Sequence, residues 1–270
     1  MLLHRIVIAV FSVIFLSSAN VGHAEEMSGR QIMDEVADRQ ERPYEYEVQS
    51  MVLTDKGGST EKRQLRRYVR KGEDGNFKYL IVFHDPVGVR GVALLTWQNK
   101  DKDDDQFLYL PSMGKQMKRI AKGGKRNYFM GTDFSFEDLI LESRDKFRYT
   151  KLPNETIDGQ EHFVIDAEPE DKELRATTGY KSRRLWIRKD IFFIVRIDYF
   201  DRRGRYIKRQ ISEELKQVDG KTWRAEKITV DNEMEKHKTA VEISSRSFAE
   251  TDVPSENFRQ RFVTSGKHIR

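Results

Sequence analysis

The sequence predicts a mainly β fold, in which one strongly twisted or curled antiparallel sheet of about eleven strands carries two or three helices on one face. Apolar and polar residues alternate over many short segments, as in YEYEVQSMVLT at residues 44–54. Turn signals recur about every eight to fifteen residues, which is typical of a meandering antiparallel sheet. An aromatic content of 11% supplies enough side-chain surface for a core.

The composition excludes several classes of protein. The chain has 270 residues, a net charge of +5 and a charged fraction of 34%, which suits a soluble protein with a large polar surface. It has no cysteine. Disulfides, cysteine-ligated metals, thiol nucleophiles and lipidation of a mature N-terminal cysteine are therefore excluded.

Residues 1–24 have the pattern of a secretory signal peptide. Arg5 precedes an apolar run at residues 6–16, and Gly22 and Ala24 supply the small residues of a cleavage site. The alternative is a single membrane anchor, which needs about 20 apolar residues. The run is shorter than that, so we expect cleavage near Ala24 and export of the mature protein.

A short helix is expected at the start of the mature chain. Ser28 is a suitable N-cap, apolar residues recur at helical spacing from Ile32 through Gln40, and Pro43 follows the helix. The pattern then changes to that of strands. In this first half, strands are expected at residues 44–54, 63–70, 77–83, 89–97 and 106–110.

Residues 111–146 break the strand rhythm, and there we expect a loop followed by a helix that starts near Asp133 or Ser135. A short helical turn is expected within residues 250–262. One domain spans residues 25–262, and residues 263–270 lack periodicity, so a loose tail is expected. In the second half, strands are expected at residues 147–151, 162–167, 180–188, 192–200, 205–216, 223–232 and 237–247.

The motifs of several enzyme classes are missing from the sequence. There is no H-E-x-x-H, no G-x-S-x-G and no phosphate-binding P-loop, and we expect no metal, no cofactor and no catalytic residue. Glu137 and Asp138 are adjacent acids, which diverge on a helix and favour its N-terminus. A carbohydrate-active enzyme with two carboxylates in one cleft stays open as an alternative.

A basic segment interleaved with methionines and aromatic residues is one candidate site. Its charge favours contact with a lipid headgroup, an anionic membrane surface or an acidic partner protein, whereas export of the protein argues against nucleic acid. The alternative is a solvated connecting loop. The basic residues of this segment are Lys115, Lys118, Arg119, Lys122, Lys125 and Arg126.

The strands carry an excess of aromatic and aliphatic residues, which is the second candidate site. These side chains fill a dry core or line a partly open hydrophobic cavity, and both uses require the same residues. A register error of one residue would move each of them to the other face. The candidate cavity residues are Phe77, Tyr79, Ile81, Phe83, Leu94, Phe107, Tyr109, Phe193, Val195 and Ile197.

Two motifs resemble the LolA-like outer membrane lipoprotein-sorting family of Gram-negative periplasms. One is the Tyr109-Leu-Pro-Ser segment that leads into the basic segment, and the other is Gly131-Thr-Asp-Phe-Ser-Phe-Glu-Asp-Leu139. The signal peptide followed by a short helix and the W-x-R-K-D pattern at Trp186 are further similarities. The residues of the second motif expected to shape a lid are Gly131, Asp133, Phe134, Phe136 and Asp138.

The resemblance implies an unclosed antiparallel β-barrel with short helices as a lid over a hydrophobic cavity. It also implies a non-catalytic periplasmic carrier that shelters the acyl chains of lipoproteins or other lipids. Its partners would be an inner-membrane transporter and an outer-membrane acceptor, with transient membrane contact. Two alternatives stay open: a lipid-sensing or protein-binding module of envelope-stress signalling, and an accessory partner of a lipid exporter.

Overall fold

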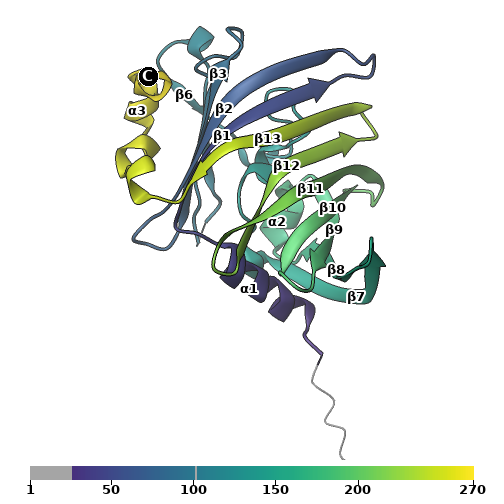
Figure 1. Ribbon diagram of the computed structural model, residues 1–270. Coiled ribbons are helices and arrows are strands. Elements are labelled where there is room, and N and C mark those ends of the chain that lie inside the picture. Colours follow the sequence, from purple (N-terminus) through teal and green to yellow (C-terminus); the bar gives the residue numbers. More distant parts are fainter. Residues whose placement is uncertain (1–25, 101) are drawn as a thin grey trace, which may run out of the picture.

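The computed structural model describes residues 26–100 and 102–270, so the expected signal peptide at residues 1–24 lies outside the described residues. Thirteen strands form one antiparallel sheet in the order β6-β5-β4-β3-β2-β1-β13-β12-β11-β10-β9-β8-β7. The sheet curls strongly and does not close, because β6 and β7 remain as its two edges (Figure 1). This confirms the expected fold class, with thirteen strands in place of about eleven and with helices on both faces of the sheet rather than on one.

The strands are long in the middle of the sheet and short at the β6 edge. The first six are β1 (Tyr44–Thr54), β2 (Thr60–Lys71), β3 (Phe77–Asp85), β4 (Ala93–Trp97), β5 (Asp105–Tyr109) and β6 (Met117–Arg119). The other seven are β7 (Phe147–Ile157), β8 (Gln160–Pro169), β9 (Tyr180–Arg188), β10 (Phe193–Asp201), β11 (Tyr206–Asp219), β12 (Thr222–Asn232) and β13 (His237–Ser247).

Helical structure in the described residues is confined to short elements. The three α-helices are α1 (Gly29–Gln40), α2 (Lys172–Thr177) and α3 (Gln260–Thr264). No helix among the described residues is long and apolar enough to cross a membrane. The 3-10 turns are η1 (Pro111–Met113), η2 (Lys122–Gly124), η3 (Phe136–Leu139), η4 (Arg144–Lys146), η5 (Glu250–Asp252), η6 (Ser255–Phe258) and η7 (Lys267–Ile269).

Helix α1 begins and ends where the sequence predicts. The Gln31 N–H donates to Ser28 Oγ (3.3 Å), and the Ser28 N–H donates to Gln31 Oε1 (2.8 Å). This reciprocal capping box satisfies backbone donors that the first helical turn leaves free. The helix buries Ile32, Met33 and Val36 against the sheet.

The β7–β8 hairpin is longer than expected. Asp158 and Gly159 both have positive φ, at 50° and 76°. A two-residue turn of this kind matches the twist of antiparallel strands and closes them directly. Strand pairing therefore extends along residues 152–157, which the sequence analysis assigned to a loop.

The expected helix near Asp133 or Ser135 is wrong. Only the single turn η3 forms, because the chain is extended again at Ile140 (φ −129°, ψ 158°). The Leu141 N–H then donates to the Tyr79 hydroxyl (3.3 Å) instead of to a helical carbonyl. Strand β6, also in this region, was hidden by its short length.

The expectation of a loose tail at residues 263–270 is also wrong. Val263 is fully buried, and His268 Nε2 lies 3.0 Å from the carbonyl oxygen of Gly91. The His268 ring also meets the edge of Tyr109 at a centroid distance of 5.3 Å. A five-residue helix and one 3-10 turn are too short to produce a period that a sequence pattern could reveal.

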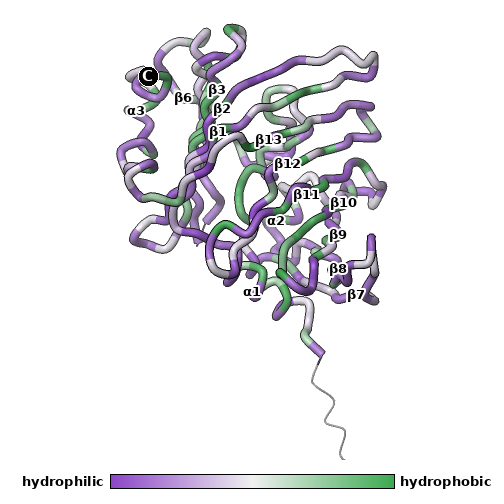
Figure 2. The backbone as a smooth tube through the Cα atoms, in the orientation of Figure 1, coloured by the Kyte–Doolittle hydropathy of each residue, from purple (hydrophilic) through white to green (hydrophobic). Residues whose placement is uncertain are grey.

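The curled sheet has two faces that we call inner and outer. The outer face of β3–β5 is covered by the C-terminal segment, residues 248–270, drawn in yellow in Figure 1. The inner face is covered by residues 120–146 near β1–β4 and by α1 near β7–β10. Figure 2 shows the result along β3, where apolar residues are continuous because both faces are buried.

Candidate functional site

An apolar cluster on the inner face is covered by residues 128–139, which we call the cover segment. Phe129 and Phe136 of this segment are buried, and their ring centroids lie 5.4 Å apart. Phe129 also packs on Phe83 of the sheet at 5.7 Å. The sheet residues beneath the cover segment are Met51, Leu53, Leu65, Ile81, Phe83, Leu94, Val241 and Ile243.

Asp133 anchors one part of the cover segment to β13. Its backbone N–H donates to Thr239 Oγ1 (3.0 Å), and Thr239 Oγ1 lies 2.7 Å from Asp133 Oδ2. His237 Nδ1 lies 2.6 Å from the same carboxylate oxygen. The motif aspartate therefore joins the cover segment to two neighbouring positions on the inner face.

Asp138 anchors a second part through Lys208 of β11. The Lys208 ammonium donates to Asp138 Oδ2 (2.6 Å) and to the Asp133 carbonyl oxygen (2.7 Å), and both side chains are 1% exposed. Burial opposes ionisation of Asp138, but Lys208 and the Ser135 N–H outweigh burial and lower the pKa of Asp138. The charged pair is thus a buried link between cover and sheet.

Glu137 has the opposite environment to its neighbour. Its carboxylate accepts from Thr178 Oγ1 (2.6 Å) and from the Gly179 N–H (2.8 Å). Burial, followed by the nearby Asp138 charge, raises the pKa of Glu137. The adjacent acids diverge as the sequence predicts, because Asp138 pairs with Lys208 whereas Glu137 accepts from Thr178 and Gly179.

The cover segment itself has little regular structure. Apart from η3, its described pairing is an isolated bridge between Tyr128 and Ser135. Met130 and Gly131 have positive φ, at 50° and 74°, which turns the chain between the two buried phenylalanines. The structure thus brings the motif residues Gly131, Asp133, Phe134, Phe136 and Asp138 together on this segment.

The other part of the inner face lies beneath α1. Ile32, Met33 and Val36 of the helix pack on Leu185 and Ile187 of β9. The helix backbone also approaches β7 closely, because a Cβ added at Gly29 would lie 2.5 Å from the Tyr149 carbonyl oxygen. Any side chain at position 29 would therefore push this helix off the sheet.

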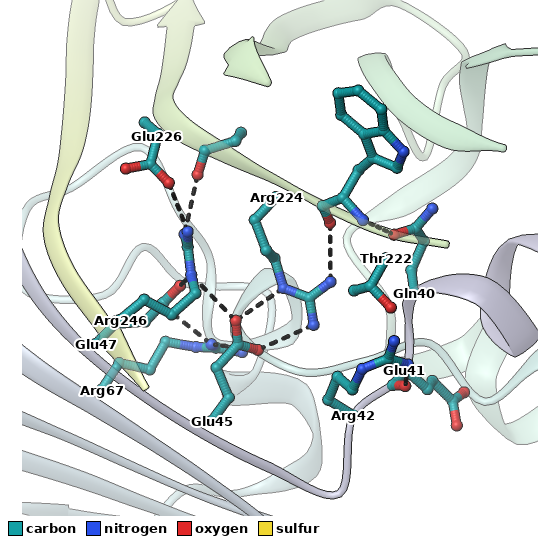
Figure 3. Close-up of polar contacts among 12 residues, drawn as sticks. Gln40, Glu41, Arg42, Glu45, Glu47, Arg67, Thr222, Arg224, Glu226 and Arg246 are labelled. Atoms are coloured by element: carbon teal, nitrogen blue, oxygen red, sulfur yellow. Dashed lines mark hydrogen bonds and ion pairs between the residues drawn. The ribbon is translucent and has the colours of Figure 1, made fainter. Parts of the chain in front are cut away.

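A largely buried group of charges on the inner face, which we call the charge cluster, joins side chains of β1, β2, β12 and β13 (Figure 3). Arg246 Nε donates to Glu47 Oε1 (2.8 Å), and Arg224 Nε donates to Glu45 Oε1 (2.7 Å). Positive and negative side chains are equal in number. The charge cluster comprises Glu45, Glu47, Arg67, Arg224, Glu226 and Arg246.

The glutamates of β1 in the charge cluster are buried although they are ionisable. Glu47 is only 5% exposed, and burial disfavours its ionised form. Arg67 and Arg246 overcome this penalty and lower the pKa of Glu47. Alternation in β1 assigned these residues to one face correctly, but it could not reveal that arginines from three other strands meet them there.

Five of the ten candidate cavity residues lie on the inner face near the cover segment. Ile81, Phe83 and Leu94 belong to the cluster beneath the segment. Phe77 and Tyr79 lie in the adjacent cluster, against which Ile140 packs. The protein's own side chains therefore fill this part of the inner face.

The other five do not share that region. Phe107 and Tyr109 face the opposite way, in the outer cluster beneath the C-terminal segment, so their assignment to the same cavity is wrong. In β10 a bulge at Val195 breaks the alternation, and Ile194 rather than Phe193 joins Ile187 beneath α1. Ile197 is on the inner face, also beneath α1.

The six candidate basic residues divide into two groups. Arg119 pairs with Asp105, Lys122 pairs with Asp103 and Glu173, and Lys125 donates to the Asp104 carbonyl oxygen (2.7 Å). These contacts fix the segment against the β4–β5 loop and α2. Within the described ranges, the other three make no ion pair: Lys115, Lys118 and Arg126.

Comparison with solved structures identifies the class of protein to which this open sheet with its cover belongs. A candidate outer membrane lipoprotein-sorting protein domain from Vibrio parahaemolyticus superposes with a TM-score of 0.81 and 29% identity, over 87% of this chain and 98% of that domain. A DUF1329 family protein from Desulfovibrio piger ATCC 29098 gives 0.79 and 26%, over 86% and 95%.

A LolA superfamily protein from Nitrosomonas europaea shares the fold, with a TM-score of 0.67 and 16% identity over 87% of this chain and 98% of that one. The resemblance to the LolA-like group is thereby confirmed. A family model described as "-like: Uncharacterized protein" matches residues 75–265, and the chain belongs to that family. No curated protein matches the chain.

Proposed function

We propose that this protein is a non-catalytic carrier that shelters acyl chains of lipoproteins or other lipids in the periplasm on their way towards the outer membrane. The chains bind on the inner face, where the cover segment now lies. An inner-membrane transporter supplies the cargo and an outer-membrane acceptor receives it.

One observation carries the proposal: an apolar wall on a curved sheet is covered by a segment without regular structure. Phe129 and Phe136 pack against this apolar surface as an acyl chain would. The segment is attached through polar side chains rather than through sheet pairing. Asp133 and Asp138 bind β13 and β11. Arg63 and Gln106 of the sheet also donate to backbone carbonyls of the segment. Displacing it would exchange two aromatic rings for a lipid tail.

The energetics of acyl transfer fit such a site. Each methylene removed from water contributes about 0.8 kcal/mol, so a sixteen-carbon chain faces roughly 12 kcal/mol in the aqueous phase. A free chain therefore needs shelter to cross an aqueous compartment. A carrier must also release its cargo, and the return of Phe129 and Phe136 to the wall offsets part of the binding free energy.

The first experiment is native mass spectrometry with lipid extraction on mature protein purified from a periplasmic fraction. We expect a bound mass that resolves into a lipid or an acylated peptide. Delipidated protein should then take up a fluorescent fatty acid. A clean unliganded mass together with no uptake would contradict the proposal.

A matched pair of variants localises the cargo. Phe136→Ala removes a buried ring from the inner face, and Phe258→Ala removes a comparably buried ring from the outer face. We expect fatty-acid uptake to increase several-fold for Phe136→Ala, because the cavity left behind is apolar and open to a chain. Equal uptake by the two variants would place the cargo elsewhere.

A further inference from the structure

A small cavity lies at the gap between the two open edges of the sheet. It has a volume of about 80 Å³, and its lining comes from the β4–β5 loop and η2 on one side and from the start of β7, the end of α2 and β9 on the other. Since one water occupies about 30 Å³ in the liquid, the space suits a single small polar group.

The cavity lining has an apolar part and a basic part. Ile140, Leu141 and Phe147 supply apolar surface, and Leu141 is 43% exposed. Lys122, Lys125, Lys146 and Arg183 are the basic lining residues. An amphiphilic ligand, with a charged group beside an apolar chain, matches such a lining.

Two of the basic residues lack a carboxylate partner. Lys125 donates only to the Asp104 carbonyl oxygen, and Lys146 makes no side-chain hydrogen bond or ion pair within residues 26–100 and 102–270. Arg183, by contrast, is paired with Glu142. Burial lowers the pKa of Lys125, and a bound anion would oppose that shift.

The acidic lining residues are already engaged by other donors. Asp103 pairs with Lys122 (3.2 Å), Asp104 accepts from the Asn99 N–H (2.8 Å), and Glu137 accepts from Thr178 and Gly179. Burial raises the pKa of Asp104 and of Glu137. Because these carboxylates already have partners, the ammonium groups of Lys125 and Lys146 remain available to a ligand.

We propose that this cavity binds a phosphate-type anion through Lys125 and Lys146, with the phosphate of a lipid headgroup as the occupant that best fits its apolar side. Ile140 connects the two sites, because it lines this cavity and packs on the cluster of Phe77 and Tyr79. A headgroup held here would direct its acyl chain towards the inner face. The proposal rests on the proposed carrier function and adds the polar end of the cargo.

Calorimetric titration of delipidated mature protein, in a buffer free of phosphate, tests the site with two probes. One is inorganic phosphate and the other is a short-chain phosphatidic acid below its micellar concentration. We expect both to bind. Phosphatidic acid binding at least tenfold tighter identifies a lipid headgroup as the source, and equal affinity identifies free phosphate.

Variants separate this site from general basic charge. Lys146→Gln should weaken both probes about tenfold, because one charge-assisted contact is lost. It should fold normally, since no described residue pairs with Lys146. Lys125→Gln is the second test. Lys115→Gln is the control, because Lys115 is exposed in the same basic segment but does not line the cavity.

Equal binding by Lys146→Gln, Lys125→Gln and Lys115→Gln, or no binding of either probe to the wild type, would overturn the anion site. An uncharged fluorescent monoacylglycerol reports on the carrier function separately. Its retention by a protein that ignores phosphate would remove only the anion site. Its loss alongside normal phosphate binding would remove only the carrier.

Discussion

The inner face has two covers that are built differently. Helix α1 is a capped, regular helix whose backbone touches the sheet at Gly29 and whose charged side includes ion pairs from Arg144 to Asp34 (3.1 Å) and to Glu41 (2.9 Å). The cover segment has one 3-10 turn and depends on the side chains of Asp133 and Asp138.

The difference shows which cover can move. Opening α1 would break helix packing, close backbone contact and ion pairs together, so α1 serves as a fixed wall. Opening the cover segment would break side-chain hydrogen bonds, one buried ion pair and apolar packing, but no strand pairing and no regular helix. The charge cluster on the same face opposes passage of an acyl chain, because a chain that crossed it would strip paired ions of their partners.

The largest effect should come from breaking the buried ion pair that holds the cover. Lys208→Met leaves Asp138 buried without its cation, and we expect the free energy of unfolding to fall by about 3–5 kcal/mol. Fatty-acid uptake should accelerate, because the cover segment detaches more readily. Urea unfolding and stopped-flow fluorescence measure the two effects.

The double variant Lys208→Met with Asp138→Asn is the control for that experiment. Asparagine is neutral and still offers an oxygen to the Ser135 N–H and the Tyr180 hydroxyl, so removal of the unpaired ion should restore part of the lost stability. If the double variant is no more stable than Lys208→Met alone, the pair does not act as a unit and the comparison of the two covers fails.

A change beneath α1 should lower stability without affecting uptake. Ile32 is fully buried, so Ile32→Ala should cost about 3 kcal/mol through lost burial and the cavity left behind. Thermal unfolding measures the loss. Uptake measured well below the melting temperature should equal that of the wild type, and faster uptake would show that α1 also opens.

Most of the sheet could be predicted because alternation and turn residues are local signals. Residues 44–54, 180–188 and 237–247 form strands with the predicted bounds. The position of α1 followed from Ser28 as its N-cap and from the helical spacing of its apolar residues. The cover segment could not be predicted, since long-range contacts such as Lys208 to Asp138 override the local preference of its sequence for a helix.

Part of the candidate site was also predictable, because alternation along a strand is a local signal. Alternation placed Ile81 and Phe83 on one face, and the structure keeps them together. It failed in β10, where the bulge at Val195 shifts the register, and in β5, where nothing local tells the inner face from the outer face. Lys208 is a lone lysine in a charged strand, and no pattern distinguishes it from its exposed neighbours.

The buried Lys208–Asp138 pair, which holds only the cover segment, also predicts how the free energy of unfolding depends on pH. The pKa of Asp138 lies below its ordinary value of 3.8, so its stabilising contribution is complete above that pH and is lost as pH falls through the lowered pKa. Urea unfolding at pH 5 and pH 3 should show a smaller loss for Asp138→Asn than for the wild type. Equal losses would mean that other carboxylates govern acid unfolding.

The smallest effect should come from the capping box of α1. Ser28→Ala removes the side-chain acceptor of the Gln31 N–H, and N-cap serines contribute about 1 kcal/mol. Thermal unfolding should register this loss, whereas fatty-acid uptake should stay unchanged because packing of Ile32, Met33 and Val36 still holds the helix on the sheet. If so slight a change accelerated uptake, α1 would be a second movable cover and the fixed wall would have to be sought in the charge cluster.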